Sequence, residues 1–180
     1  MRVKILSEHG YDEAMLGLSL SYNQQIEKME NVAIRLAPKD GGHNKFLESI
    51  FVWVDIVAPR YWWQQFDAYR IGVTKQSEST MHTLVKRPLT QNDFSEVIPA
   101  WYMDYLNNLI EEKRFFILKS CLPEGFLQRR IVCLNYKSIR HIMKQRGLHK
   151  LFEWREFCLA MVNGLKHGEL IRDISIAESI

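Results

Sequence analysis

The sequence predicts a mixed α/β protein of the α+β class, a single helix-rich domain with a small sheet. Short runs rich in β-branched and aromatic residues, at 3–6, 50–58 and 129–136, are typical of strands. Longer stretches between them carry apolar residues at helical spacing, as amphipathic helices do. The chain has 180 residues, 47% of them hydrophobic and 25% charged, so we expect one globular domain over 1–180.

The first half of the chain alternates these elements. The strand at 3–6 is followed by a helix for which Asp12 is the expected N-cap. Residues 37–46 contain a proline, two glycines and an asparagine, which indicates a loop. The strand at 50–58 should end at Pro59, which can open the next helix because a first helical turn needs no N–H from it.

The second half is predicted to be mostly helical. Pro99 should begin a long helix over 100–120, ended by the LPEGF segment at 122–126. After the strand at 129–136 we expect helices at 138–145 and 148–166, with Ser138 capping the first and Gly168 marking the end of the second. The expected buried residues of the 100–120 helix are Trp101, Tyr105, Leu109, Phe116 and Leu118.

Composition excludes several classes of function. The net charge of +3 suits an anionic ligand but does not indicate a nucleic-acid polymer as partner. No apolar run is long enough to span a membrane, and the N-terminus does not resemble a signal peptide. The three cysteines, without CxxC spacing, are typical of reduced core residues in a cytoplasmic protein. The six histidines form no HExxH or Cys/His pattern, so no metal site is expected, and P-loop, GxGxxG and GxSxG motifs are absent from the sequence.

One polar cluster lies in the PRYWWQQFDAYR segment, 59–70. Aromatic residues, Gln65 and Tyr69 or Arg70 recur there at three- and four-residue spacing, so they would share one face of a helix. An amide can read the edge of a nucleobase, and a guanidinium can bind phosphate or a carbonyl. The alternative is that the aromatic rings are core and that Gln65 and Arg70 bond loop carbonyls.

A second polar cluster surrounds the predicted strand-to-helix turn near residue 136. Helix N-termini favour anions, so donors gathered here are candidates for an anionic ligand. The alternative is a solvated basic helix face. The donors are Asn135, Lys137, Arg140, His141, Lys144, Arg146, His149 and Lys150.

Taken in chain order, these segments resemble the flavin-dependent thymidylate synthases, the ThyX family. GGHNKFLESIFVWV is similar to the family's GHxSxLEH…FxF, and PRYWWQQFDAYR stands at its Q-x-x-RHR helix. KSCLPEGF stands at AR-x-x-LP, LNYKSIRHIMKQR at N-x-R-S-L-x-x-x-x-x-x-R, and HKLFEWRE at HAQWEIRE. The resemblance covers most of the chain and implies the fold of the thymidylate synthase-complementing proteins.

The resemblance also implies a reaction. Such enzymes bind FAD, reduce it with NADPH, and transfer the methylene of 5,10-methylenetetrahydrofolate to carbon 5 of dUMP, giving dTMP. No cysteine nucleophile is needed, which agrees with cysteines that lack an activating context. The family's members are homotetramers whose flavin sites are shared between subunits.

By position, the resemblance implies substrate contacts for Gln65, Lys119, Ser79 and Arg146. Arg146 would also be catalytic, because its fixed charge would polarise the pyrimidine ring. Lys119 stands where the family has an arginine, so the charge is kept and the bidentate fork is lost. The cofactor contacts implied are Arg70, Asn135, Lys137, His141 and His149.

The chain also departs from the family pattern. RHR is replaced by Ala68-Tyr69-Arg70, and the histidine of LEH is replaced by Ser49. The phosphate-binding arginine after RHR has no counterpart in 76–82, where Ser77, Ser79 and Thr80 offer hydroxyls; Lys75, Lys86 and Arg87 are candidates to replace it. Two alternatives to dUMP methylation follow: hydroxymethylation of dUMP or dCMP on the same scaffold, and a non-catalytic homologue that binds nucleotide.

Overall fold

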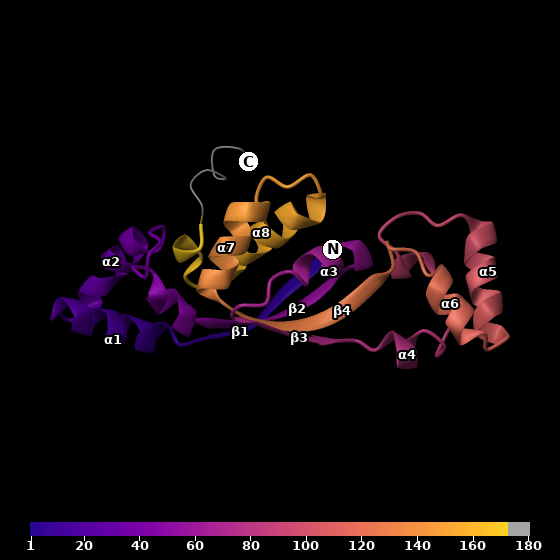
Figure 1. Cartoon of the computed structure of the whole chain (residues 1–180), viewed down its shortest axis with the longest axis horizontal. Coiled ribbons are helices and arrows are strands. Elements are labelled where there is room, and N and C mark those ends of the chain that lie inside the picture. Colours follow the sequence, from indigo (N-terminus) through magenta and orange to yellow (C-terminus); the bar gives the residue numbers. More distant parts are fainter. Residues whose placement is uncertain (173–180) are drawn as a thin grey trace. The chain divides into compact units, whose positions relative to one another are not determined.

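The computed structural model describes residues 1–172, which contain eight α-helices and one four-stranded sheet (Figure 1). Backbone hydrogen bonds from Tyr136 to Ile50 and from Arg60 to Phe126 mark opposite ends of the central strand pair and show that its strands are antiparallel. The predicted α+β class is therefore confirmed. The strands, in sheet order, are β1 (Arg2–His9), β2 (Phe51–Pro59), β4 (Leu127–Asn135) and β3 (Val73–Ser77).

The described residues form two compact units. The first unit comprises 1–2, 56–68 and 76–130, and the second comprises 3–55, 69–75 and 131–172. All four strands pass from one unit into the other along the chain, β1 after its first residue.

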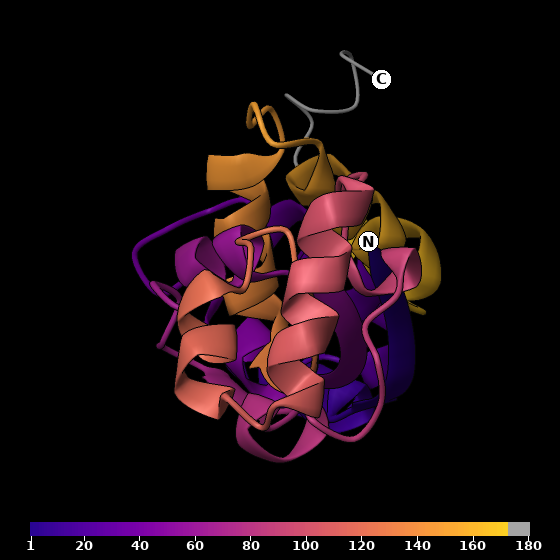
Figure 2. The same cartoon turned by 90° about the vertical axis from the view of Figure 1, so that its right-hand side faces the viewer.

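The first unit contains α3 (Arg60–Phe66), α4 (Thr80–Thr83), α5 (Ala100–Glu111) and α6 (Phe115–Cys121). Figure 2 shows α5 and α6 packed side by side. The prediction of one helix over 100–120 was therefore wrong.

The break between α5 and α6 falls at Lys113, which adopts a left-handed backbone conformation with φ 56°. Backbone N–H groups of Lys113 and Arg114 bond back to the carbonyls of Ile110 and Leu109, which closes α5 as a left-handed C-cap does. The chain then turns back, and α6 packs against α5.

This break changes which residues are buried. Leu109 and Leu118 are buried as predicted, but Trp101 is 71% exposed and Phe116 is 82% exposed, and Tyr105 is also exposed. For Phe116 the reason is the turn at Lys113, which resets the helical phase that the prediction took as continuous. Trp101 and Tyr105 precede this turn, on α5, whose buried residues are Leu106 and Leu109. The core residues of this unit are Leu84, Leu89, Phe94, Leu106, Leu109, Leu118, Leu122 and Phe126.

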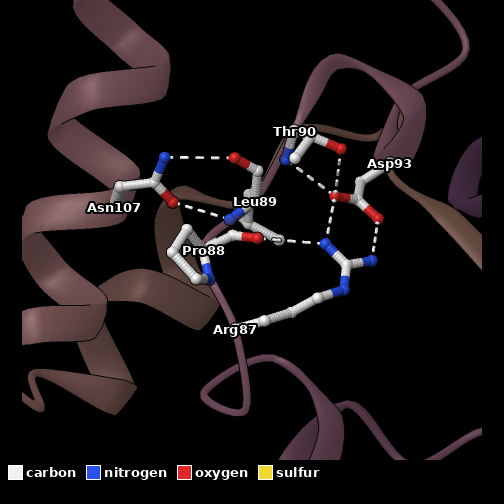
Figure 3. A network of polar contacts seen from close by, with 6 residues as sticks. All are labelled: Arg87, Pro88, Leu89, Thr90, Asp93 and Asn107. Atoms are coloured by element: carbon white, nitrogen blue, oxygen red, sulfur yellow. Dashed lines mark hydrogen bonds and ion pairs between the residues drawn. The ribbon is translucent and has the colours of Figure 1, made fainter.

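A network of hydrogen bonds and an ion pair holds the loop at residues 87–93, which precedes α5 (Figure 3). Both polar atoms of the Asn107 side chain bond the backbone of Leu89, at 2.7 and 3.1 Å. Arg87 binds the Asp93 carboxylate through two nitrogens, at 2.5 and 2.8 Å. Partial burial raises the pKa of Asp93, but hydrogen bonds from Arg87 and Thr90 outweigh it, so the pKa falls below its usual range. Arg87, a candidate for phosphate binding, is thus engaged in holding this loop.

The second unit contains α1 (Tyr11–Tyr22), α2 (Met29–Leu36), α7 (Tyr136–Arg146) and α8 (Phe152–Gly164). Helix α1 packs against α2, α7 packs against α8, and both α1 and α7 contact a 3₁₀ helix, η2 (Lys45–Ser49). Figure 1 shows the α1–α2 pair in indigo and purple and the α7–α8 pair in orange and yellow.

Two predicted helix caps were wrong. The N-cap of α1 is Gly10, with φ 88°, and Asp12 lies in the first turn. The N-cap of α7 is Asn135, and the predicted strand at 129–136 correspondingly ends one residue early. Ser138 is not the cap: its backbone N–H donates to the Asn135 side-chain oxygen at 2.9 Å. Asn135 is the cap because it is the last residue of β4, where the backbone is already extended as an N-cap requires.

Candidate functional site

The predicted site residues divide between the two units. Gln65, Ser79 and Lys119, the candidates for substrate contact, belong to the first unit. All the predicted cofactor contacts and Arg146 belong to the second unit, and all but Arg70 lie on α7 or directly beside it.

The first turn of α7 holds the segment that carries Arg70. The Ser138 hydroxyl donates to the carbonyl of Ile71 at 2.6 Å, and the Asn135 N–H donates to the carbonyl of Gly72 at 3.1 Å. Lys137, on the same turn, forms an ion pair with Glu48 at 2.5 Å. The structure therefore places Asn135 and Lys137 at a helix N-terminus, a place that favours anionic groups, and holds the backbone that follows Arg70 beside it.

A pocket of about 600 Å³ opens in the same unit, between α1 and residues 42–49. Its wall includes Glu48, the partner of Lys137, and Ser49, which replaces the histidine of the LEH motif. Sequence analysis missed the rest of this wall. A signal was present in α1, where the small residues Ala14, Gly17 and Ser21 share one helical face and leave space beside it. The remaining lining residues are Glu13, Leu18, Tyr22, Leu36, Gly42, His43, Lys45 and Phe46.

The last turn of α7 carries Arg146 against aromatic rings. Its Nε donates to the Tyr69 hydroxyl at 2.9 Å, and its guanidinium carbon lies 5.1 Å from the centroid of the Trp154 ring and 5.9 Å from that of Tyr69. Tyr69 also meets the ring of His141 edge-on, with centroids 6.2 Å apart. These contacts fix a positive charge in one orientation, which is what stabilisation of developing negative charge requires.

The predicted polar face of the 59–70 helix does not form. Helix α3 ends at Phe66, and Tyr69 and Arg70 lie in the following turn, within the second unit. Gly72, with φ 66°, reverses the chain there. Trp62 and Phe66 are fully buried and stack at 5.0 Å, so for these rings the core interpretation is correct. Gln65 is half-buried on α3.

In the first unit the structure brings Lys119 to the hydroxyls of α4. The Lys119 Nζ donates to the Thr80 hydroxyl at 2.6 Å, and Ser79 is the exposed residue that precedes α4. An ammonium beside a hydroxyl suits a phosphate group. Lys119 and Ser79 are both predicted substrate contacts, and Lys119 bonds the residue that follows Ser79.

His149 follows α7 and is held as a neutral imidazole. Its Nδ1 accepts a hydrogen bond from the backbone N–H of Leu151 at 3.1 Å, so that nitrogen carries no proton. Burial, and then the positive charges of Arg146 and Lys150, lower the pKa of His149 below its usual value. The imidazole is therefore uncharged at neutral pH.

Replacing Arg146 by glutamine is expected to raise the pKa of His149, because a nearby positive charge that disfavours the imidazolium is removed. An NMR titration of the His149 ring protons would measure this. Lys144→Gln is the matched control: it also removes one positive charge from the last turns of α7, and Lys144 is not among the groups that shift His149. Equal pKa values in the wild type and in Arg146→Gln would contradict the placement of His149 beside Arg146.

Other classes of site find no support in residues 1–172. None of the helices there is both apolar and long enough to cross a membrane. The same residues contain no group of three or more His, Cys, Asp or Glu side chains placed to hold a metal ion. Burial raises the pKa of the Cys133 thiol and raises that of Cys158 to about 12, so neither is a thiolate at neutral pH.

Comparison with known proteins gives a fold relationship. No family model and no curated protein sequence matches this chain. Among solved structures, the flavin-dependent thymidylate synthase ThyX from Helicobacter pylori, complexed with FAD and dUMP, matches with a TM-score of 0.80 at 18% identity, covering 96% of this chain and 99% of that chain. Another structure of Thymidylate Synthase X from H. pylori with FAD and dUMP matches with a TM-score of 0.81 at 17% identity, covering 96% and 98%. The chain therefore has the fold of the flavin-dependent thymidylate synthases.

Proposed function

We propose that this protein is a flavin-dependent enzyme that transfers a one-carbon unit to carbon 5 of a pyrimidine deoxynucleotide, converting dUMP to dTMP. FAD is the proposed cofactor, 5,10-methylenetetrahydrofolate the carbon donor and NADPH the reductant. The observation that carries the proposal is Arg146, held by Tyr69 and Trp154. It lies on a fold whose H. pylori representative binds FAD and dUMP. A homotetramer, which the family resemblance implies, and a cytoplasmic location, which the reduced cysteines suggest, are also part of the proposal.

The residues of the second unit fit an anionic, aromatic cofactor. The N-terminus of α7 carries Lys137, which is paired with Glu48, and holds the backbone of the segment that follows Arg70; we propose that the pyrophosphate of a dinucleotide would be stabilised there. The nearby pocket offers both apolar and polar walls, and its volume of about 600 Å³ is typical of a small-molecule site. Bound FAD, once reduced, would supply the hydride that completes the methyl group.

The chain's own residues would bind and polarise the nucleotide. Arg146 would donate to the pyrimidine carbonyl region and stabilise negative charge as it develops on the ring. In the first unit, Lys119 with Ser79 is proposed to hold a nucleotide phosphate, and Gln65 to bond a nucleotide through its amide. Protonated Cys133 and Cys158 thiols agree with a reaction that uses no cysteine nucleophile.

The replaced RHR motif favours a second candidate, hydroxymethylation of dUMP or dCMP. Two flavin-facing residues of the family are Ala68 and Tyr69 here, and the Tyr69 hydroxyl is occupied by Arg146 and Gln145. With Ala68 and an already bonded Tyr69 hydroxyl in place of two flavin contacts, the supply of hydride would be weaker. After tetrahydrofolate has left, water would then add to the methylene on carbon 5 and give a hydroxymethyl group. A homologue that binds nucleotide without turnover is the third possibility.

Two measurements separate these functions. The purified protein is mixed with FAD and passed over a gel-filtration column, and a flavin absorbance band that travels with the protein supports the cofactor. The protein is then incubated with dUMP or dCMP, methylenetetrahydrofolate and NADPH, with a folate-free control, and the nucleotide is analysed by mass spectrometry. A methyl gain supports the main proposal, and a hydroxymethyl gain supports the second. Failure to take up FAD contradicts both, and binding of dUMP without any mass change leaves the non-catalytic homologue.

A further inference from the structure

Tyr69 stands where the family motif has a histidine, and its side chain is built into the surroundings of Arg146. It is only 9% exposed, and its ring meets the Trp154 ring edge-on with centroids 5.9 Å apart. Arg146 lies 77 positions further along the chain, so the contact is a product of the tertiary fold. A histidine side chain is shorter than tyrosine and has no hydroxyl at its tip.

The hydroxyl of Tyr69 forms two hydrogen bonds whose directions agree. A phenol has one proton to donate, and Tyr69 donates it to the side-chain oxygen of Gln145 at 3.0 Å. Its oxygen lone pairs are then available to accept from Arg146, whose Nε lies at 2.9 Å. Each bond strengthens the other because both polarise the phenol in the same sense.

This arrangement determines the plane of the Arg146 guanidinium. The hydrogen bond at Nε holds the guanidinium plane at the end nearest the aliphatic part of the side chain. The centroid of the Trp154 ring lies 5.1 Å from the guanidinium carbon. A long, flexible side chain ordered before the ligand arrives loses less conformational freedom on binding. Arg146 is thus preorganised in the free protein.

We propose that Tyr69 is a positioning residue for Arg146, and that its hydroxyl, supported by Gln145, fixes the orientation in which the guanidinium meets its ligand. The ligand and the catalytic role of Arg146 rest on the proposed function. The positioning itself is a property of the free protein, and it is measured without ligand.

The test compares Tyr69→Phe with the wild type by carbon-detected NMR of the arginine side chains, in which the Arg146 Nε signal is assigned by its loss in Arg146→Lys. Tyr69→Phe keeps the buried ring and removes only the hydroxyl. The Arg146 Nε–H should then exchange with solvent at least about tenfold faster, and its Nε signal should shift toward that of an exposed arginine. Gln145→Ala, which leaves Tyr69 in place, should give a smaller change in the same direction. Tyr105→Phe, which removes an exposed hydroxyl in the first unit, should leave the signal unchanged.

Unchanged exchange and an unchanged Nε signal in Tyr69→Phe would overturn the proposal. Nucleotide binding gives the second readout: with a positioning role, Tyr69→Phe weakens dUMP affinity about tenfold, while thermal unfolding stays close to that of the wild type. If wild-type protein binds no pyrimidine nucleotide, the proposed function fails, and the NMR result still decides whether Tyr69 positions Arg146. A large Nε change with unaltered dUMP affinity would show that the hydrogen bond exists and has no positioning role in binding.

Discussion

Replacement of Arg146 by alanine is expected to abolish nucleotide turnover in a protein that remains folded. If Arg146 supplies the fixed charge that the reacting pyrimidine needs, its removal should lower kcat by at least about 100-fold, as loss of one preorganised donor does elsewhere. The guanidinium lies against the rings of Tyr69 and Trp154. Losing these contacts and the Nε hydrogen bond to Tyr69 should cost about 2 kcal/mol of unfolding free energy. Activity is measured by mass analysis of the nucleotide, and folding by circular dichroism and thermal unfolding.

Lys144→Ala is the matched control for this substitution. Lys144 lies two positions earlier on α7, its side chain is 70% exposed, and its ion pair with Asp40 spans 3.8 Å at the surface, where such pairs contribute little. Turnover should therefore be unchanged in Lys144→Ala. Arg146→Lys should remain strongly impaired, because lysine keeps the charge and loses the planar fork and the Nε–H. Full activity in Arg146→Ala would show that the basic segment of α7 was assigned the wrong role.

The parts of the fold that the sequence predicted are those decided by local chemistry. The strand at 50–58 was recognised because β-branched and aromatic residues favour a buried strand, and Pro59 sets its end in both sequence and structure. The basic segment was recognised as a strand followed by a helix, and β4 and α7 confirm it. In each case short-range preferences and the tertiary fold agree.

The features that the sequence did not predict depend on competition between two possible N-caps or on contacts between residues far apart in the sequence. Asn135 and Ser138 are both good N-caps, and only the end of β4 decides between them. Nothing in the local sequence requires a non-glycine residue such as Lys113 to adopt φ 56° and divide the helix at 100–120. Tyr69 was placed on a helical face with Gln65, whereas the fold carries it to Arg146. A pairing between residues so far apart cannot be read from helical spacing.

Alanine in place of Gly10 is expected to have the largest effect on stability of the substitutions considered. Gly10 caps α1 with φ 88°, a conformation that costs an L-residue about 1–2 kcal/mol. An added Cβ would also lie 2.2 Å from the backbone oxygen of Ser49. The Ser49 oxygen belongs to the backbone and cannot rotate away as a side chain could, so the backbone at Gly10 or Ser49 must shift. Overpacking of this kind costs about 1–3 kcal/mol. The free energy of unfolding should therefore fall by about 3 kcal/mol, measured by denaturant titration.

Gly41→Ala separates the two causes. Gly41 has φ 71° in the same unit, but an added Cβ there meets no atom within 4 Å, so only the backbone strain of about 1–2 kcal/mol remains. The additional loss of unfolding free energy in Gly10→Ala, relative to Gly41→Ala, then measures how closely the start of α1 approaches Ser49. Ser49 lines the candidate cofactor pocket, so Gly10→Ala should also weaken FAD uptake under conditions in which it is still folded, whereas Gly41→Ala should not. Equal losses of stability in the two variants would show that the approach is looser than the structure has it, and that Gly10 is required for its backbone conformation alone.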